Sequence, residues 1–156
     1  MVRPITAVLV GYLVMAAWIM ATLTLAWKLL GPSFAFHPGT TQVSLGWVAV
    51  TLPLSFGLGA VLGGFIAGSI ARSRENKAVR ALAVIVLVLG LVMAVKDLVS
   101  DPAGRDPASD PVVVIEEMSA FEASSEAVRP TWYSFLIPFV GLAGILLGGR
   151  LVGKRG

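Results

Sequence analysis

Four long runs of apolar residues dominate the chain and limit what it can fold into. No charged side chain occurs within residues 5–27, 47–71, 81–95 and 132–149. A helix needs about 20 mostly apolar residues to cross a bilayer. The third run is shorter, so Arg80 and Lys96 at its ends must extend to reach water. We therefore predict an all-α integral membrane protein whose four transmembrane helices form a bundle, at residues 5–27, 47–71, 80–99 and 131–152.

The composition agrees with a membrane protein. Only 13% of the 156 residues are charged and the mean hydropathy is +0.86, whereas soluble domains carry about 25% charged residues. We expect a single transmembrane domain over residues 1–156. A secretory signal has an apolar core of roughly 7–15 residues, so we interpret the longer first run as a retained helix. The chain contains no cysteine, which excludes disulfides and thiolate sites.

Charged residues are distributed unevenly between the predicted loops. Basic residues concentrate in the segment 72–80 and near both termini, whereas acidic residues concentrate near the loops 28–46 and 100–130. By the positive-inside rule, the loop 72–79 and both termini face the cytoplasm. The aromatic residues at 27, 47, 132 and 133 then lie at the outer interface, where amphipathic rings are common. The net charge of +3 is thus a topology signal, and no nucleic-acid partner is predicted.

The stretch GLGAVLGGFIAGSIAR, residues 57–72, is rich in glycine. A phosphate-binding loop needs a strand before it and a helix after it. These glycines lie inside an apolar run, so no nucleotide is predicted. Small residues recur every four positions in two adjacent rows, a flat stripe that another helix backbone can approach closely; a stripe that lines a substrate path is the alternative. We predict helix-packing contacts through Gly59, Ala60, Gly63, Gly64, Ala67, Gly68, Gly144, Gly148 and Gly149.

The second and fourth runs also share a motif. WVAVTLPLSFGLGAVLGGFIAG (47–68) aligns without gaps with WYSFLIPFVGLAGILLGGRLVG (132–153), an offset of 85 residues, and VLVGYLVMA (8–16) resembles VLVLGLVMA (86–94). We infer a tandem duplication of a helical hairpin. Hairpins 1–2 and 3–4 would then be related by a pseudo-two-fold axis along the membrane normal. Convergence under shared constraints is the alternative.

The aligned prolines, Pro53 and Pro138, lie near the outer ends of their helices. A proline inside a helix removes a backbone hydrogen bond and usually kinks the axis. We therefore predict kinks at both positions. Paired kinks would splay the outer ends of the second and fourth helices and open a shallow cleft, or the regular helices would simply begin later.

The predicted outer loops offer few binding residues. Phe34, Phe36 and His37 are expected to rest on the membrane surface, and a lone histidine such as His37 would need partners from elsewhere to hold a metal or pigment. The loop 100–130 contains three Asp-Pro steps, an acidic turn region for which calcium binding is the alternative to solvation. We predict a short amphipathic surface helix at 113–127, with a strand at 112–115 as the competing interpretation.

The chain shows no nucleophile–base pair, carboxylate pair or histidine cluster, so no enzyme activity, metal or cofactor is predicted. An ionisable residue inside the membrane usually indicates transport or proton transfer, and none of the runs has one at mid-depth. Lys96, Asp97 and Arg150 fit the role of interfacial anchors. Lys96, Asp97 and His37 are the candidate functional polar residues.

Three segments together, LGGFIAGSIAR (62–72), ALAVIVLVLGLV (81–92) and WYSFLIPFVGLAGILLGGRL (132–151), resemble small four-helix bacterial inner-membrane proteins of unknown function. The resemblance implies a compact four-helix bundle in a bacterial cytoplasmic membrane. We expect a non-enzymatic structural or accessory protein that packs through its glycine faces, as a homo-oligomer or with other membrane subunits. The alternative is a small transporter or channel with a path between the two hairpins. A polar cavity there would favour transport, and a dry interior would favour the accessory role.

Overall fold

The structure is a computed structural model that describes residues 2–38, 42–71, 77–99, 119, 123 and 127–153. Within these residues the chain is helical apart from two isolated β-bridges. Four helices are long and apolar enough to cross a membrane, which confirms the predicted class of all-helical, multi-pass membrane protein. The predicted surface helix at 113–127 lies almost entirely outside the described residues, and the alternative strand at 112–115 lies wholly outside them.

The spanning helices extend up to three residues beyond the predicted limits. The second consists of three consecutive segments, the middle one a π-helix, and a four-residue helix, α2 (Pro32–Ala35), follows the first. In chain order the spanning elements are α1 (Val2–Leu30), α3 (Leu45–Thr51) with η1 (Leu52–Gly57) and α4 (Leu58–Ala71), α5 (Lys77–Val99), and α7 (Thr131–Gly153).

Local sequence explains where the first two spanning helices end and begin. Gly31 follows α1 with a φ of 75°, a left-handed conformation that glycine adopts without steric cost and that commonly ends helices. Ser44 precedes α3, and its hydroxyl accepts a hydrogen bond of 3.0 Å from the backbone N–H of Trp47. This N-cap satisfies one of the amides that the first turn leaves unpaired.

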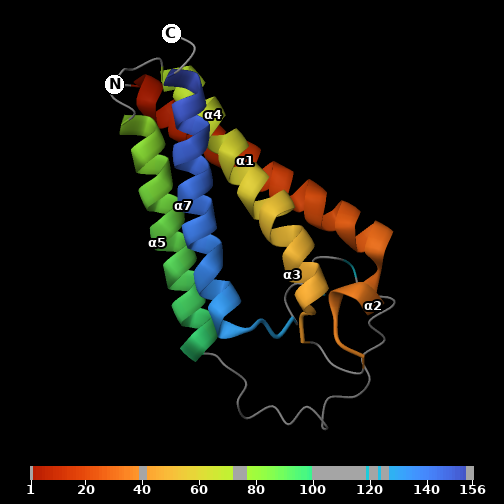
Figure 1. Cartoon of the computed structure of the whole chain (residues 1–156). Coiled ribbons are helices and arrows are strands. Elements are labelled where there is room, and N and C mark those ends of the chain that lie inside the picture. The colour runs from red at the N-terminus through yellow and green to blue at the C-terminus, as the bar shows by residue number, and fades with distance from the viewer. Residues whose placement is uncertain are drawn as a thin grey trace.

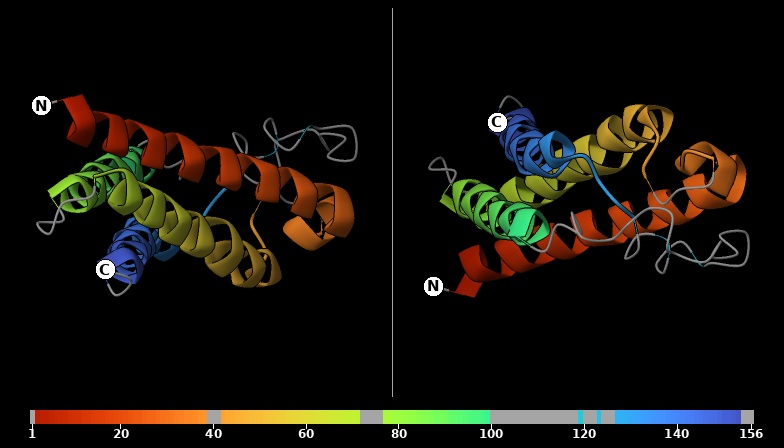
Figure 2. Two further views of the ribbon diagram at one scale, coloured as in Figure 1. Left: turned by 90° about the horizontal axis from the view of Figure 1, so that it is seen from above. Right: turned by 90° about the horizontal axis from the view of Figure 1, so that it is seen from below.

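The start of α1 and the end of α7 lie at the same end of the molecule (Figure 1). We call this the terminal end and the opposite one the loop end. α4 packs against both α1 and α7, and α5 packs against α7. The helices are close together at the terminal end, whereas toward the loop end α1 and α3 diverge from α5 and α7 (Figures 1 and 2).

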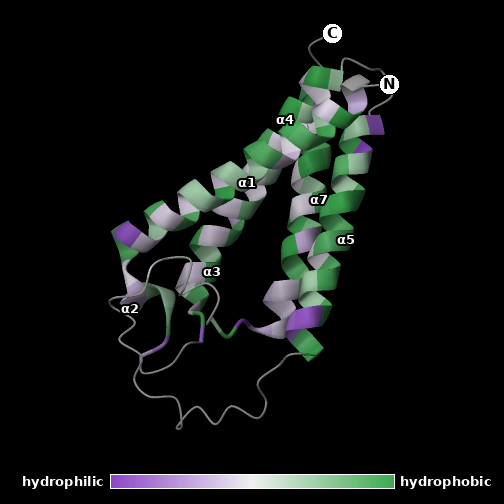
Figure 3. Cartoon of the chain, turned by 180° about the vertical axis from the view of Figure 1, so that it is seen from behind, coloured by the Kyte–Doolittle hydropathy of each residue, from purple (hydrophilic) through white to green (hydrophobic). Residues whose placement is uncertain are grey.

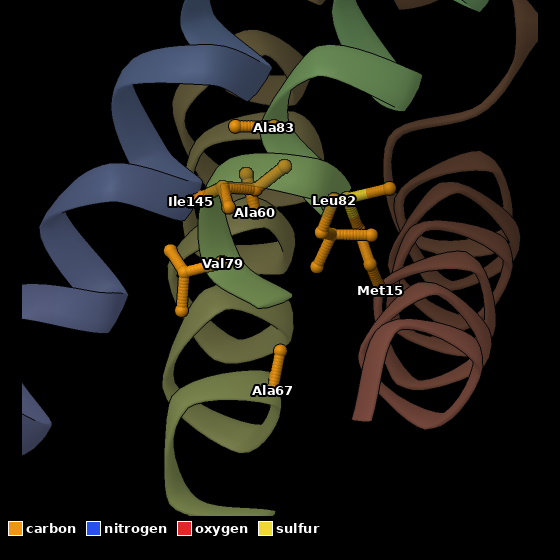
Figure 4. Close-up of a cluster of buried hydrophobic side chains, with 7 residues drawn as sticks. All are labelled: Met15, Ala60, Ala67, Val79, Leu82, Ala83 and Ile145. Carbon is orange, nitrogen blue, oxygen red and sulfur yellow. The ribbon is translucent and has the colours of Figure 1, made fainter. Parts of the chain in front are cut away.

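The core has two parts. Toward the terminal end, small and medium side chains from α1, α4, α5 and α7 meet (Figure 4), namely Met15, Ala60, Ala67, Val79, Leu82, Ala83 and Ile145. A second cluster at the loop end includes Phe36, Val43 and Tyr133. Phe36 was expected on the membrane surface, but only 7% of it is exposed. It is buried because the chain folds back there: Phe36 bridges to Val43, whose amide donates to the carbonyl of Val128 at 3.1 Å.

The outward surfaces of the spanning helices are apolar along most of their length, and hydrophilic residues gather near the helix ends (Figure 3). Large apolar side chains on α1 and α5 are well exposed, among them Leu13 at 63% and Met93 at 61%. A helix that is apolar all round is buried in protein or in lipid. These exposed faces therefore fit contact with a bilayer.

Candidate functional site

The predicted packing residues of α4 are all buried, and their two rows contact two different helices. The row with Gly59, Gly63 and Ala67 faces α1: a methyl group added to Gly63 would lie 2.8 Å from the carbonyl oxygen of Gly11. The adjacent row faces α7, where a methyl group added to Gly64 would collide with the backbone of Ile145. The sequence indicated one stripe and one neighbour, whereas the structure has α4 between two neighbours.

The remaining packing residues lie against the same helices. Gly68 faces α7, with Val152 nearby, and Ala60 lies opposite Gly144. A methyl group on Gly144 would lie 2.7 Å from the Cβ of Ala60. Gly149 faces α5, where the added methyl group would lie 2.6 Å from a Cγ of Val79. The glycine faces therefore hold the chain's own helices together.

The closest contacts between α4 and α7 are reciprocal. Gly64 meets the backbone carbonyl of Ile145, and Gly148 meets the backbone carbonyl of Val61. Gly148 follows Gly64 by 84 residues, and Ile145 follows Val61 by the same number. The sequence motifs align at 85 residues. A π-helix uses i→i+5 hydrogen bonds and so carries one extra residue, and η1 stands between the aligned prolines and these contacts in the second helix alone.

The two prolines have different structural roles. Pro53 lies in η1, where the α-helical pattern is replaced by a π-helix. Pro138 lies within the α-helix α7 and packs against α5: a methyl group added to Gly90 would lie 2.6 Å from the Cβ of Pro138. Only the proline of the second helix accompanies a change of helix type.

The divergence of the helices leaves a cavity of about 390 Å³, which we call the inter-pair cleft. Twelve residues line it, and only Tyr12 among them has a polar group on its side chain. The walls come from α1, η1, α5 and α7, and include Met15, Ile19, Phe56, Leu89, Met93 and Ile137. The cleft is therefore a site for an apolar occupant.

A second cavity of about 80 Å³, which we call the loop-end pocket, lies beside the cleft. Its lining is rich in aromatic rings and includes the side chain of Arg129. Trp27 makes edge-to-face contacts with Phe36 and Trp47, with ring centroids 6.0 and 6.1 Å apart. Phe56 and Ile137 line both cavities, so these two side chains separate the pocket from the cleft.

Few polar side chains lie inside the protein near these cavities. The hydroxyls of Thr51 and Tyr133 are 3.4 Å apart, and Thr51 also donates to the carbonyl of Trp47 at 2.8 Å. Ser55 on η1 is fully buried and its hydroxyl has no hydrogen-bond partner. An unpaired buried hydroxyl costs free energy, so Ser55 is the one polar group of η1 that the fold leaves unsatisfied.

The candidate polar residues do not form a site with these cavities. Asp97 accepts a hydrogen bond of 3.1 Å from the hydroxyl of Ser134, near the loop end of α5. Lys96 and His37 are exposed. Over the part of the chain that the structure describes, no three His, Cys, Asp or Glu residues are placed to hold a metal ion.

No protein-family model, curated protein or solved structure matches this chain. The site must therefore be understood from its own geometry. The residues that line both cavities, Phe56 and Ile137, were not singled out from the sequence. Their one sequence signal is position, because each lies within three residues of a helix proline.

Proposed function

We propose that this chain is a non-enzymatic accessory protein of a bacterial cytoplasmic membrane, a four-helix bundle with both termini in the cytoplasm. Its task is to bind an apolar component of the membrane between its two helix pairs. The apolar lining of the inter-pair cleft carries this proposal. The basic residues near the terminal end support the orientation.

The glycine contacts support a self-contained bundle. Because both glycine rows of α4 are used within the chain, a second copy or another membrane subunit would contact the exposed apolar faces of α1 and α5 instead. The reciprocal contacts of Gly64 and Gly148 support a pseudo-two-fold relation between α4 and α7, and with it the duplication of a hairpin. In this proposal the symmetry builds the closed terminal end, and the divergence at the loop end creates the binding site.

A transporter or channel is the second candidate, because all four spanning helices contribute to the walls of the cleft. A path for ions or hydrophilic solutes needs polar groups that replace water, since charges are costly in a low-dielectric interior. The cleft offers a single hydroxyl, from Tyr12. This lining favours an apolar occupant over a hydrophilic solute.

Site-directed spin labelling separates the two candidates, since the chain contains no cysteine. Leu89→Cys introduces a label into the cleft, and Val88→Cys is the matched control: the two side chains are 49% and 52% exposed, but only Leu89 lines the cleft. In liposomes we expect both labels to be relaxed by oxygen, which dissolves in lipid, and neither by a water-soluble nickel complex. Strong nickel relaxation at position 89 alone would mean a water-filled path and would overturn the accessory role.

A further inference from the structure

The occupant of the inter-pair cleft can be narrowed by size. A turn of α-helix with its side chains is about 10–12 Å wide and 5.4 Å long, so it fills roughly 400–600 Å³. The cleft holds about 390 Å³, which is less than one turn and far less than a spanning helix. A flexible hydrocarbon chain, which is narrow, fits such a space.

The position of the loop-end pocket indicates what lies at the end of that chain. The pocket adjoins the cleft through Phe56 and Ile137. Its tryptophans, Trp27 and Trp47, are of the type that lies at headgroup depth in membrane proteins. Arg129 also lines the pocket, and a guanidinium group binds phosphate oxygens through paired hydrogen bonds.

From these observations we propose that the two cavities form one site for a phospholipid of the leaflet at the loop end. An acyl chain occupies the inter-pair cleft, Phe56 and Ile137 contact it where the cavities meet, and the phosphate binds near Arg129. This inference rests on the proposed function, because it names the apolar component that the accessory protein binds. It adds a headgroup contact that the proposed function does not require.

Native mass spectrometry of the full chain in mild detergent tests the site with two probes, dioleoyl phosphatidylglycerol and a diacylglycerol with the same chains. Leu89→Trp fills the cleft and should lower retention of both probes at least tenfold. Val88→Trp, on the neighbouring position outside the cleft, should retain both like the wild type. If Leu89→Trp fails to fold, Leu89→Cys labelled with a bulky maleimide after purification blocks the same space in a folded chain.

The headgroup contact is tested by Arg129→Gln, with Lys96→Gln as the control for a loop-end cation outside both cavities. A hydrogen bond to a charged group is worth about 1.5–3 kcal/mol, so Arg129→Gln should weaken phosphatidylglycerol roughly tenfold or more. Diacylglycerol binding should not change, and Lys96→Gln should affect neither probe. Equal effects of Arg129→Gln and Lys96→Gln on phosphatidylglycerol would overturn the headgroup contact while leaving the proposed function intact. A co-purifying polypeptide that Leu89→Trp releases would replace the lipid with a partner helix.

Discussion

The second and fourth spanning helices carry the same tryptophan–proline–glycine motif, yet they fold differently. The second contains the π-helical segment η1, and the fourth is a regular α-helix through Pro138. Both then meet face to face through glycines, with Gly64 and Gly148 in reciprocal positions. The comparison teaches that a single extra residue in one helix can change the register of a repeat without changing its contacts.

The side chains around each proline explain the difference. Thr51 and Ser55 flank Pro53, whereas the aligned positions in the fourth helix are Leu136 and Val140. In membranes, hydroxyl side chains and local π turns compensate for the hydrogen bonds that a proline removes. In η1 the carbonyl of Leu54 is also bonded from outside, by the indole N–H of Trp18 at 3.0 Å. The second helix therefore has both the side chains and the neighbour that a π turn requires.

The largest expected effect comes from closing the glycine contact between the two helices. Gly64→Ala and Gly148→Ala each place a methyl group against backbone of the other helix, which cannot rotate away as a side chain can. Overpacking of this kind costs about 1–3 kcal/mol and sometimes more. We expect both variants to lose about 3 kcal/mol of unfolding free energy in detergent, measured by reversible denaturation.

The control for this prediction is Gly57→Ala, in the same spanning helix. Its added methyl group would meet only ordinary contacts, 3.5 Å from the carbonyl of Leu52 and 3.9 Å from Val140. We expect its stability to stay within about 0.5 kcal/mol of the wild type. If Gly64→Ala and Gly148→Ala differ strongly from each other, the two helices do not meet reciprocally.

The second prediction concerns Ser55, whose counterpart in the fourth helix is the apolar Val140. Because the hydroxyl of Ser55 is buried without a partner, Ser55→Ala should stabilise the protein, by about 1 kcal/mol on the scale of an unsatisfied buried group. The same denaturation assay measures it. A loss of stability instead would show that the hydroxyl supports the π turn.

Much of this architecture can be predicted from the sequence, because uncharged runs of sufficient length have few alternatives to spanning helices. The four-residue spacing also identifies the small residues of α4. Which neighbour each row contacts is not predictable, because rows at Gly63 and Gly64 are adjacent on the helix and suit either partner. The cleft is less predictable still. Phe56 and Leu89 are ordinary apolar residues in a membrane helix, and only the divergence of the helices turns them into the walls of a cavity.

The third prediction tests the bond that joins α1 to η1. Trp18→Phe keeps an aromatic ring but removes the indole N–H that donates to the carbonyl of Leu54. Hydrogen bonds inside membrane proteins contribute about 0.6 kcal/mol on average and up to about 1.7. We expect a loss of about 1 kcal/mol, whereas Trp132→Phe, at a ring that is 51% exposed, should cost less. Equal losses for the two variants would mean that ring size, not the hydrogen bond, determines stability.

The smallest expected effect concerns the polar link between the second and fourth helices, formed by Thr51 and Tyr133. Their oxygens are 3.4 Å apart, which is long for a bond between two hydroxyls, and Thr51 already donates to the carbonyl of Trp47 at 2.8 Å. A double-mutant cycle with Thr51→Val and Tyr133→Phe should therefore give a coupling energy below about 0.5 kcal/mol. A coupling above about 1 kcal/mol would mean a full hydrogen bond between the helices. In that case the two helices would be joined by polar contacts at the loop end as well as by glycine at their crossing, and the cleft beside them would be more rigid than its apolar walls imply.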